Sequence, residues 1–238
     1  MKLPISNRLK CCAGLVPPGS RVYDVGCDHG YLGIYLLREG LATHVFSSDL
    51  RPGPLQRARE NALLYGVQEQ MSFQLCDGLA AYDGTEGSVI VIAGMGGDAI
   101  ANILDACPWV QSPSYTLVLQ PQTSGNDLRR YLGRVGWNAR QEVLVRDKGF
   151  VYTAMVCTFG GGVPVSPGRE YVPEALLSQP GDLLEAYFTH VLHGLNVAVD
   201  GLRRSTQPQD QPRLAYYETA LREVLEMKAQ YDHSTERI

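Results

Sequence analysis

The sequence lacks a long apolar run and a secretory leader. No stretch of its 238 residues approaches the length that crosses a membrane, so no membrane partner is expected. Residues 1–10 contain no apolar core region of the kind that a signal peptide needs. We therefore expect a cytoplasmic protein.

The cysteine and histidine patterns of a metal site are also missing. The six cysteines include no Cys-x-x-Cys pair and lie mostly in apolar or strand-like contexts, which is typical of reduced, packed thiols. His29 and His44 have no second ligand at a helical or knuckle spacing. No metal is therefore expected.

A third absence is an excess of positive charge. The chain has 21 Lys and Arg residues against 25 Asp and Glu residues, so its net charge of −4 provides no general attraction to phosphate. Any contact with RNA must therefore come from local basic clusters. Such clusters occur at 2–10, 129–134, 146–148 and 203–204.

The most informative segment combines a strand, a glycine turn and a helix. Residues 21–25 (RVYDV) are rich in β-forming side chains, and residues 31–39 predict an amphipathic helix that Gly40 ends. The turn between them is 26–30 (GCDHG). This order is typical of a nucleotide-binding loop, although an ordinary turn between a strand and a helix explains the glycines equally well.

The composition of this turn argues against a pyrophosphate cofactor. A dinucleotide-binding turn has the pattern Gly-x-Gly-x-x-Gly, whereas here Asp28 takes the place of the second glycine between Gly26 and Gly30. A carboxylate at that position repels a pyrophosphate. It suits S-adenosylmethionine, which carries a sulfonium and an ammonium and no phosphate. Asp24 and Asp28 can then hold the amino-acid end of this cofactor.

Further acids follow the next two predicted strands. The strand at 44–48 leads into Asp49, 23 residues after Gly26 (49 minus 26), and an acid at this spacing can accept both ribose hydroxyls. The strand at 71–76 leads into Asp77, which can accept from the adenine amino group. An aspartate at a strand end is often only a helix N-cap. Acids at the ends of successive parallel strands, however, lie where ligands of open α/β sheets bind.

A fourth strand, at 88–93, leads into the glycine-rich segment 94–97, which keeps the backbone low beside a reacting centre. The strand ends together predict one cofactor site. Its predicted residues are Asp24, Gly26, Cys27, Asp28, Gly30, Asp49, Leu50, Asp77, Gly78, Ala93 and Gly94.

The remaining elements of the first 160 residues complete a recognisable order. Residues 115–119 predict a fifth strand and 126–135 a helix, and the strands at 137–145 and 150–159 are joined by the hairpin turn 146–149. Five strands that alternate with helices, followed by an antiparallel hairpin, predict an α/β fold. Its Rossmann-like, seven-stranded sheet is that of a class I S-adenosylmethionine-dependent methyltransferase, not of a dehydrogenase.

A segment dense in glycine and proline, 160–168, marks a boundary because it breaks regular structure. With 45% hydrophobic residues, the chain can form one large domain and a small one. We predict a cofactor-binding domain at 1–162 and a helical domain at 169–238.

The predicted helical domain has apolar residues at alternating spacings of three and four. This heptad pattern covers 184–202 and 214–231, and the proline-containing segment 207–212 forces a turn between the two helices. We therefore expect an antiparallel helical hairpin, or coiled coil. Packing between the two helices explains the apolar heptad positions. Any function of the hairpin must therefore come from its exposed surface.

Four motifs carry a specific resemblance when read in order with this tail. They are 26–32 (GCDHGYL), 77–79 (DGL), 92–97 (IAGMGG) and 119–121 (LQP). The chain resembles, over essentially its whole length, the bacterial tRNA adenine-N1 methyltransferase family that modifies adenine 22 in the D-arm region. The resemblance implies S-adenosylmethionine as methyl donor and tRNA as acceptor, with the tail helping to grip the tRNA.

The chain departs from this family at two positions. Gly33 stands where the family commonly has proline, a change expected to alter only the start of a helix. Gln122 stands where asparagine commonly follows Gln-Pro, so the amide that contacts the base is kept but lengthened.

Methylation at N1 of adenine requires positioning more than base catalysis. The N1 atom of neutral adenine carries a free lone pair, so the enzyme must align it with the methyl group and exclude water. Because N1 lies on the Watson–Crick edge, a paired adenine would have to be extruded. The predicted catalytic residues are Asp28, His29, Met95 and Gln120, although His29 and Met95 can equally serve only in packing.

Two other functions remain open at this stage. A methyltransferase of small molecules would suit the acidic charge balance but leaves the heptad tail unexplained. A regulator that only binds the cofactor is the second alternative. The oligomeric state is also open, and a monomer is compatible with the sequence.

Overall fold

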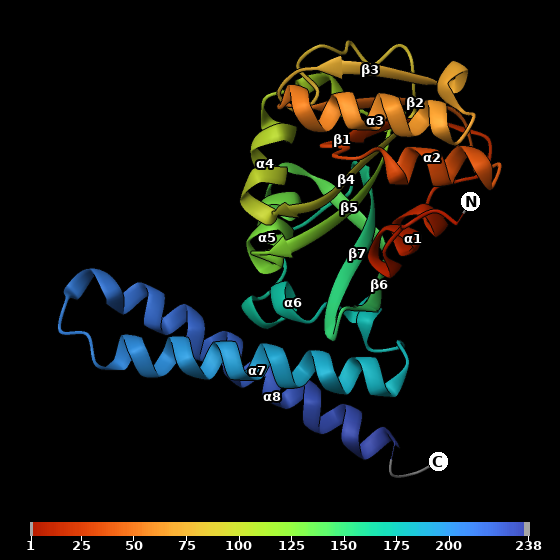
Figure 1. Cartoon of the computed structure of the whole chain (residues 1–238). Coiled ribbons are helices and arrows are strands. Elements are labelled where there is room, and N and C mark those ends of the chain that lie inside the picture. The colour runs from red at the N-terminus through yellow and green to blue at the C-terminus, as the bar shows by residue number, and fades with distance from the viewer. Residues whose placement is uncertain (1, 236–238) are drawn as a thin grey trace.

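A seven-stranded sheet forms the centre of the computed structural model, which describes residues 2–235 (Figure 1). Its strand order is β3-β2-β1-β4-β5-β7-β6, with β1 to β5 parallel and β7 antiparallel to both β5 and β6. The strands are β1 Ser20–Val25, β2 Ala42–Asp49, β3 Met71–Leu75, β4 Val89–Gly96, β5 Thr116–Thr123, β6 Trp137–Asp147 and β7 Phe150–Phe159. The predicted strands and the predicted class of sheet are thus confirmed.

Helices cover both faces of this sheet. They are α1 Asn7–Gly14, α2 Tyr31–Arg38, α3 Pro52–Leu64, α4 Gly97–Asp105, α5 Gly125–Val135, α6 Pro167–Tyr171, α7 Gly181–Arg203 and α8 Gln211–Thr235, with short 3₁₀ helices η1 Gln68–Gln70, η2 Pro108–Val110, η3 Glu174–Leu176 and η4 Pro208–Asp210. Ile90 and Ile92 of β4 share a core with α4 and α5, whereas Val89 and Val91 share one with α1 and α2. This alternation follows from the two-residue period of a strand and explains the continuous apolar runs.

Strands β4 and β5 extend beyond their predicted ends. The sequence predicts loops at the glycine-rich and Gln-Pro segments, but β4 continues to Gly96 and β5 to Thr123. Gly94 adopts a left-handed φ of +84°, and the register shifts there before Met95 pairs with Pro121. This β-bulge lets the pairing resume. The sheet therefore holds both segments in fixed positions.

Helix α1 is not predicted from the sequence. Polar residues interrupt the apolar periodicity of this segment, so the sequence gives no clear helix pattern. Ser6 nevertheless caps the helix by accepting a hydrogen bond from the backbone N–H of Leu9 at 3.3 Å. Cys12 and Ala13 are fully buried in the core that α1 shares with α2. The helix thus packs against the sheet and brings its other side chains toward the cavity described below.

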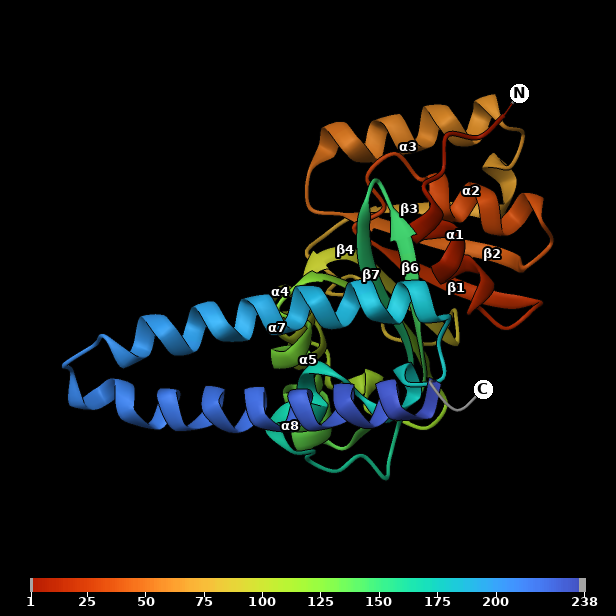
Figure 2. The ribbon, with the colours of Figure 1, turned by 90° about the horizontal axis from the view of Figure 1, so that it is seen from below.

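The two longest helices, α7 and α8, form an antiparallel hairpin whose tip extends beyond the sheet (Figures 1 and 2). Leu184, Phe188 and Leu195 of α7 are buried, as the heptad pattern predicts. On α8 the buried residues include Ala220 and Met227, which lie beside the predicted positions. The difference arises because α8 packs against α6 as well as α7. No helix within residues 2–235 combines the length and apolarity needed to cross a bilayer.

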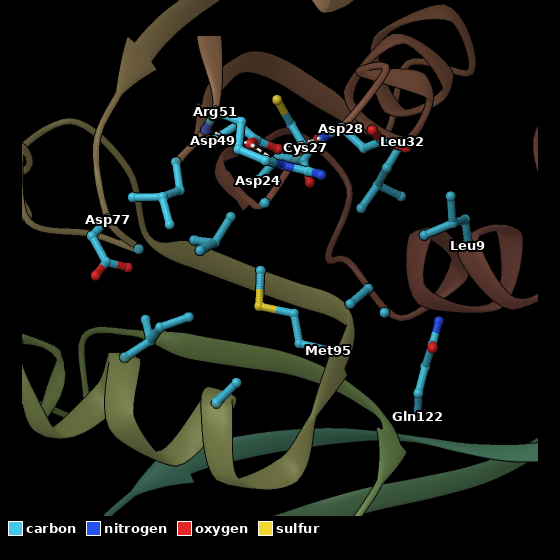
Figure 3. A pocket seen from close by; sticks show the side chains of 18 of the residues that line it. Leu9, Asp24, Cys27, Asp28, Leu32, Asp49, Arg51, Asp77, Met95 and Gln122 are labelled. Carbon is cyan, nitrogen blue, oxygen red and sulfur yellow. Dashed lines mark hydrogen bonds and ion pairs between the residues drawn. The ribbon is translucent and has the colours of Figure 1, made fainter. Parts of the chain in front are cut away.

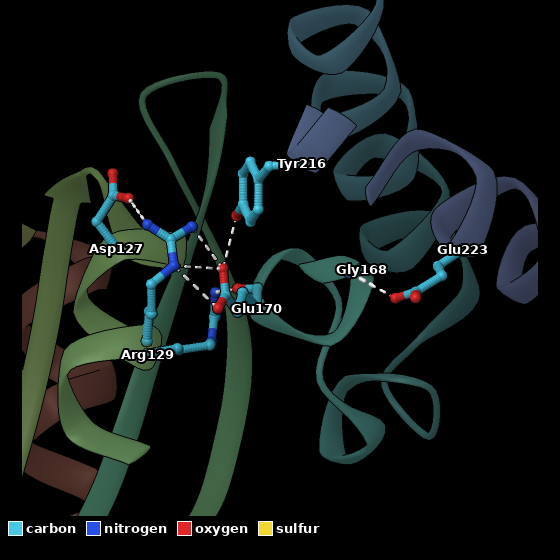
Figure 4. A network of polar contacts seen from close by, with 7 residues as sticks. Asp127, Arg129, Gly168, Glu170, Tyr216 and Glu223 are labelled. Carbon is cyan, nitrogen blue, oxygen red and sulfur yellow. Dashed lines mark hydrogen bonds and ion pairs between the residues drawn. The ribbon is translucent and has the colours of Figure 1, made fainter. Parts of the chain in front are cut away.

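A polar network, buried at Arg129, Glu142 and Glu170, joins the hairpin to the sheet (Figure 4). Arg129 of α5 pairs with Glu142 of β6 at 2.8 Å and donates to the backbone carbonyl of Glu170 at 2.9 Å. The Glu170 carboxylate in turn pairs with Arg130 at 2.6 Å and accepts from the Tyr216 hydroxyl at 2.6 Å. Because these residues come from α5, β6, α6 and α8, the network fixes the hairpin relative to the sheet.

The network also corrects one expectation from the sequence. Arg129, predicted as part of an RNA-binding cluster, is only 7% exposed and serves the structure instead. Burial opposes its ionisation, but the Glu142 carboxylate outweighs that effect and raises the pKa of the guanidinium.

Candidate active site

A cavity of about 790 Å³ opens at the carboxyl ends of β1, β2 and β4 (Figure 3). The chain order of the strands reverses at this place, since β2 lies on one side of β1 and β4 on the other. Ligands of open α/β sheets bind in the crevice at such a switch point. The volume lies within the range of about 300–1,000 Å³ that is typical of small-molecule sites.

Most of the predicted site residues line this cavity. Those that do are Asp24, Gly26, Cys27, Asp28, His29, Asp49, Leu50, Asp77, Gly78, Ala93, Gly94 and Met95. Gly30 and Gln120 are not among the residues that line it. Arg8 and Gln122 also line it; the sequence predicts Gln122 for contact with the base, and Arg8 only as part of the basic cluster at 2–10.

The carboxylate of Asp49 is held in a fixed orientation at the end of β2. Its Oδ2 accepts from the backbone N–H of Asp28 at 3.1 Å, and its Oδ1 accepts from the backbone N–H of Arg51 at 2.9 Å. Asp28 adopts a left-handed φ of +49°, which is uncommon for a residue other than glycine. Each oxygen of Asp49 retains acceptor capacity for a ribose hydroxyl.

Asp24 differs from Asp49 because part of its carboxylate is unsatisfied. The residue is 4% exposed, and its Oδ2 has no hydrogen-bond partner among the described residues. Burial, with a smaller contribution from the charge of Asp49, raises the pKa of Asp24 from 3.8 to about 7. A cation bound in the cavity would compensate this carboxylate.

Glycines let the backbone approach the cavity at the points where side chains would collide. Gly26 has a φ of +70°, and a Cβ at this position would overlap the methyl group of Met95. Gly78 has a φ of +55°, and a Cβ there would lie 2.8 Å from Ile103. In Figure 3, Met95 lies between Asp77 at one end of the cavity and Gln122 at the other.

Asp28 and His29 lie at the more exposed part of the wall. His29 Nε2 is 3.6 Å from Asp28 Oδ2, and the imidazole stacks on the ring of Tyr31 with centroids 5.6 Å apart. The side chain of Asp28 is 58% exposed and that of His29 is 36% exposed. Both can therefore reach a ligand that enters from solvent.

Arg8 places a guanidinium in a cavity that is otherwise rich in carboxylates. It extends from α1 and donates to Oε1 of Gln120, which also accepts from the backbone N–H of Gly94 at 3.2 Å. A Cβ on Gly94 would lie 3.0 Å from Arg8 Nη1, so the guanidinium faces the bulge in β4. No local pattern in the sequence reveals this contact, because 112 positions separate Arg8 from Gln120.

Gln120 and Gly30 have positions that differ from those expected of ligand-binding residues. Gln120 is fully buried, and its Nε2 donates to the carbonyl of Pro121 at 2.7 Å, so its amide is used to position Arg8 and the bulge. Gln122, in contrast, is exposed and lines the cavity. Gly30 precedes α2 with a φ of +71°, and a Cβ there would lie 3.0 Å from Ala58. It allows α2 and α3 to pack closely.

Titration of Asp24 predicts an unusual pH dependence of stability. Between about pH 4 and pH 7 the folded protein keeps a proton on Asp24 that the unfolded chain releases, so the free energy of unfolding falls as the pH rises. We expect Asp24→Asn to unfold at higher urea concentration than the wild type at about pH 8, with the difference shrinking toward about pH 4.

Urea titrations followed by circular dichroism measure this difference. Asp98→Asn, which removes an exposed carboxylate from α4, is the matched control and should show no such trend. A difference between Asp24→Asn and the wild type that stayed constant across this pH range would contradict the assignment.

Comparison with known proteins agrees with the geometry of the site. Residues 5–155 match the family described as a methyltransferase domain. The chain is 30% identical over 159 residues to the tRNA (adenine(22)-N(1))-methyltransferase of Bacillus subtilis, a match that covers 67% of each chain.

Solved structures extend the similarity to the helical hairpin. Sp1610 of Streptococcus pneumoniae, solved in complex with S-adenosyl-L-methionine, is 29% identical with a TM-score of 0.77 over 93% of this chain and 99% of its own. The tRNA methyltransferase TrmK of B. subtilis shares the fold with a TM-score of 0.81 at 24% identity, over 94% of this chain and 99% of its own. The chain therefore belongs to the bacterial tRNA (adenine-22-N1)-methyltransferase family.

Proposed function

We propose that this protein transfers a methyl group from S-adenosylmethionine to N1 of adenine 22 in tRNA. The observation that carries the proposal is the cavity at the switch point, where Asp49 is fixed by two backbone N–H groups and Asp24 retains an unpaired, buried oxygen. The B. subtilis relative named for this reaction supplies the substrate class. We also propose that the protein acts in the cytoplasm, because its proposed substrate is tRNA.

The residues of the cavity fit the cofactor group by group. Asp49 would accept from the ribose hydroxyls, and Asp77 from the adenine amino group. Asp24 would hold the ammonium, since this cation satisfies the unpaired Oδ2. Arg8 would meet the carboxylate of the methionyl group. When bound, the cofactor supplies an electrophilic methyl group on a sulfonium.

The target adenine would be held by residues at the Gln122 end of the cavity. Gln122 offers a flexible amide, and the bulge in β4 places the backbone of 94–96 beside it. Because N1 already carries a lone pair, no residue has to remove a proton before transfer. The methylated ring carries a positive charge, which the Asp28 carboxylate on the same wall would stabilise.

We further propose that residues 169–238 form the tRNA-contacting arm, gripping the RNA through the exposed tip of the hairpin. Arg203 pairs there with Glu218 at 2.8 Å, and Arg204 lies exposed beside it. These local charges would supply the attraction to phosphate that the net charge of −4 does not.

Methylation of unmodified tRNA transcripts tests the proposed reaction directly. Incubation with labelled S-adenosylmethionine, followed by nucleoside analysis, should yield 1-methyladenosine. A transcript with guanine in place of adenine 22 should accept no label, because its N1 carries a proton. A panel of small metabolites is the parallel arm. The proposal would be contradicted if the protein bound the cofactor and methylated a metabolite but left tRNA unlabelled.

Substitution of Asp49 tests the assignment of the ribose. We expect Asp49→Asn to raise the dissociation constant of S-adenosylmethionine roughly tenfold or more, because hydrogen bonds to a charged acceptor contribute about 1.5–3 kcal/mol. Isothermal titration calorimetry measures this change, with Asp98→Asn as the control of equal charge. Unchanged affinity in Asp49→Asn would refute the ribose role.

A further inference from the structure

A second, smaller cavity of about 200 Å³ lies between the β5–α5 connection and helix α7. Its walls come from residues 121–126 on one side and from α7 on the other, with the start of β7 between them. The second cavity therefore lies at the junction between the sheet and the helical hairpin. None of the predicted cofactor residues lines it.

Two contacts connect this cavity to the main one. Gln122 lines both cavities, so its amide stands at the boundary between them. Arg8 of the main cavity lies over the ring of Tyr152, which lines the second cavity, at 6.0 Å from the ring centroid. A chain bound in one cavity can thus continue into the other.

The lining of the second cavity suits a flat, partly polar ring. Its buried apolar contacts are Pro121, Val191 and Leu195. Aromatic rings come from tyrosines on β7, α6 and α7, and Tyr152 is among them. Stacking on aromatic side chains is the usual way in which proteins hold unpaired bases without reading their sequence. Thr123 adds a hydroxyl at the exposed rim.

The charge of the lining and the volume of the second cavity further restrict the class of ligand that it can bind. The main cavity is lined by four aspartates, whereas no carboxylate is among the described residues that line the second one. Arg129 on its wall is already paired with Glu142, so this guanidinium is not free to bind an isolated anion. Its volume also falls below the roughly 300 Å³ at which drug-sized sites begin. A single base fits these limits.

We propose that the second cavity binds the base of the nucleotide next to the target adenine, on one side of it in the RNA chain. This inference rests on the proposed function, and it identifies where the enzyme contacts the substrate beyond the methylated base. Enzymes that act on extruded bases commonly contact the flanking nucleotides, which set their preference for sequence context. Here Gln122 and the Arg8–Tyr152 contact would separate the two bases.

Filling the cavity from α7 tests the proposal without disturbing the core. Gly194 lines the cavity, is exposed, and has no atom within 4 Å of an added Cβ, so Gly194→Leu should fold and block the site. We expect the dissociation constant for tRNA to rise about tenfold, in line with the cost of losing one stacked base. The dissociation constant for S-adenosylmethionine should not change.

Gly14→Leu is the matched control. Gly14 is also exposed, at the end of α1, with open space around an added Cβ; it lines neither cavity and lies outside the arm proposed to contact tRNA. Its tRNA affinity should equal that of the wild type. Equal losses in both variants would assign the loss to a general effect of the added side chain and overturn the proposal, as would unchanged affinity in Gly194→Leu.

Abasic transcripts identify the base that occupies the cavity. Two tRNAs would each lack the base on one side of adenine 22. The wild type should lose about tenfold in affinity for one of them, and Gly194→Leu should lose nothing further for that transcript. Additive losses, or no loss with either transcript, would overturn the proposal. Methylation of intact tRNA by the wild type would still support the proposed function in those cases.

Discussion

The burial of two carboxylates at the ends of β1 and β2 is the constraint on which the site depends. Asp49 is stabilised by backbone N–H groups from Asp28 and Arg51, so its orientation is set before any ligand arrives. Asp24 retains an oxygen without a partner, which is destabilising in a buried position and raises its pKa to about 7. A ligand with an ammonium group and two hydroxyls would pair the ammonium with the carboxylate of Asp24. The hydroxyls would donate to the carboxylate of Asp49.

The same chain segments that build the cavity also fix the hairpin. The bulge at Gly94 and the buried amide of Gln120 position Arg8 at one end of the cavity. A few residues farther along, α5 begins, and its Arg129 joins β6 to the hairpin through Glu142 and the backbone of Glu170. These buried contacts join α5, β6 and α6, and the second cavity lies beside them, next to the first.

Much of this arrangement could be predicted from the sequence, for identifiable reasons. Buried parallel strands read as apolar runs, and the acids that end them, such as Asp49 and Asp77, mark the ligand-binding edge. The missed features depend on contacts between distant segments. Arg8 meets Gln120 only after α1 packs on the sheet, and the bulge at Gly94 is defined only by the pairing of β4 with β5. Likewise, the burial of Arg129 depends on Glu142, which no local periodicity reveals.

The central claim is that Asp24 binds the ammonium of the cofactor. Proton release on cofactor binding tests it most directly. Titration calorimetry at about pH 6, in buffers of different ionisation enthalpy, counts the protons released per S-adenosylmethionine bound. An ammonium beside Asp24 would lower its pKa, so the wild type should release close to one proton at about pH 6 and far fewer at about pH 8, whereas Asp24→Asn should release none. No release by the wild type, or equal release by Asp24→Asn, would contradict the account.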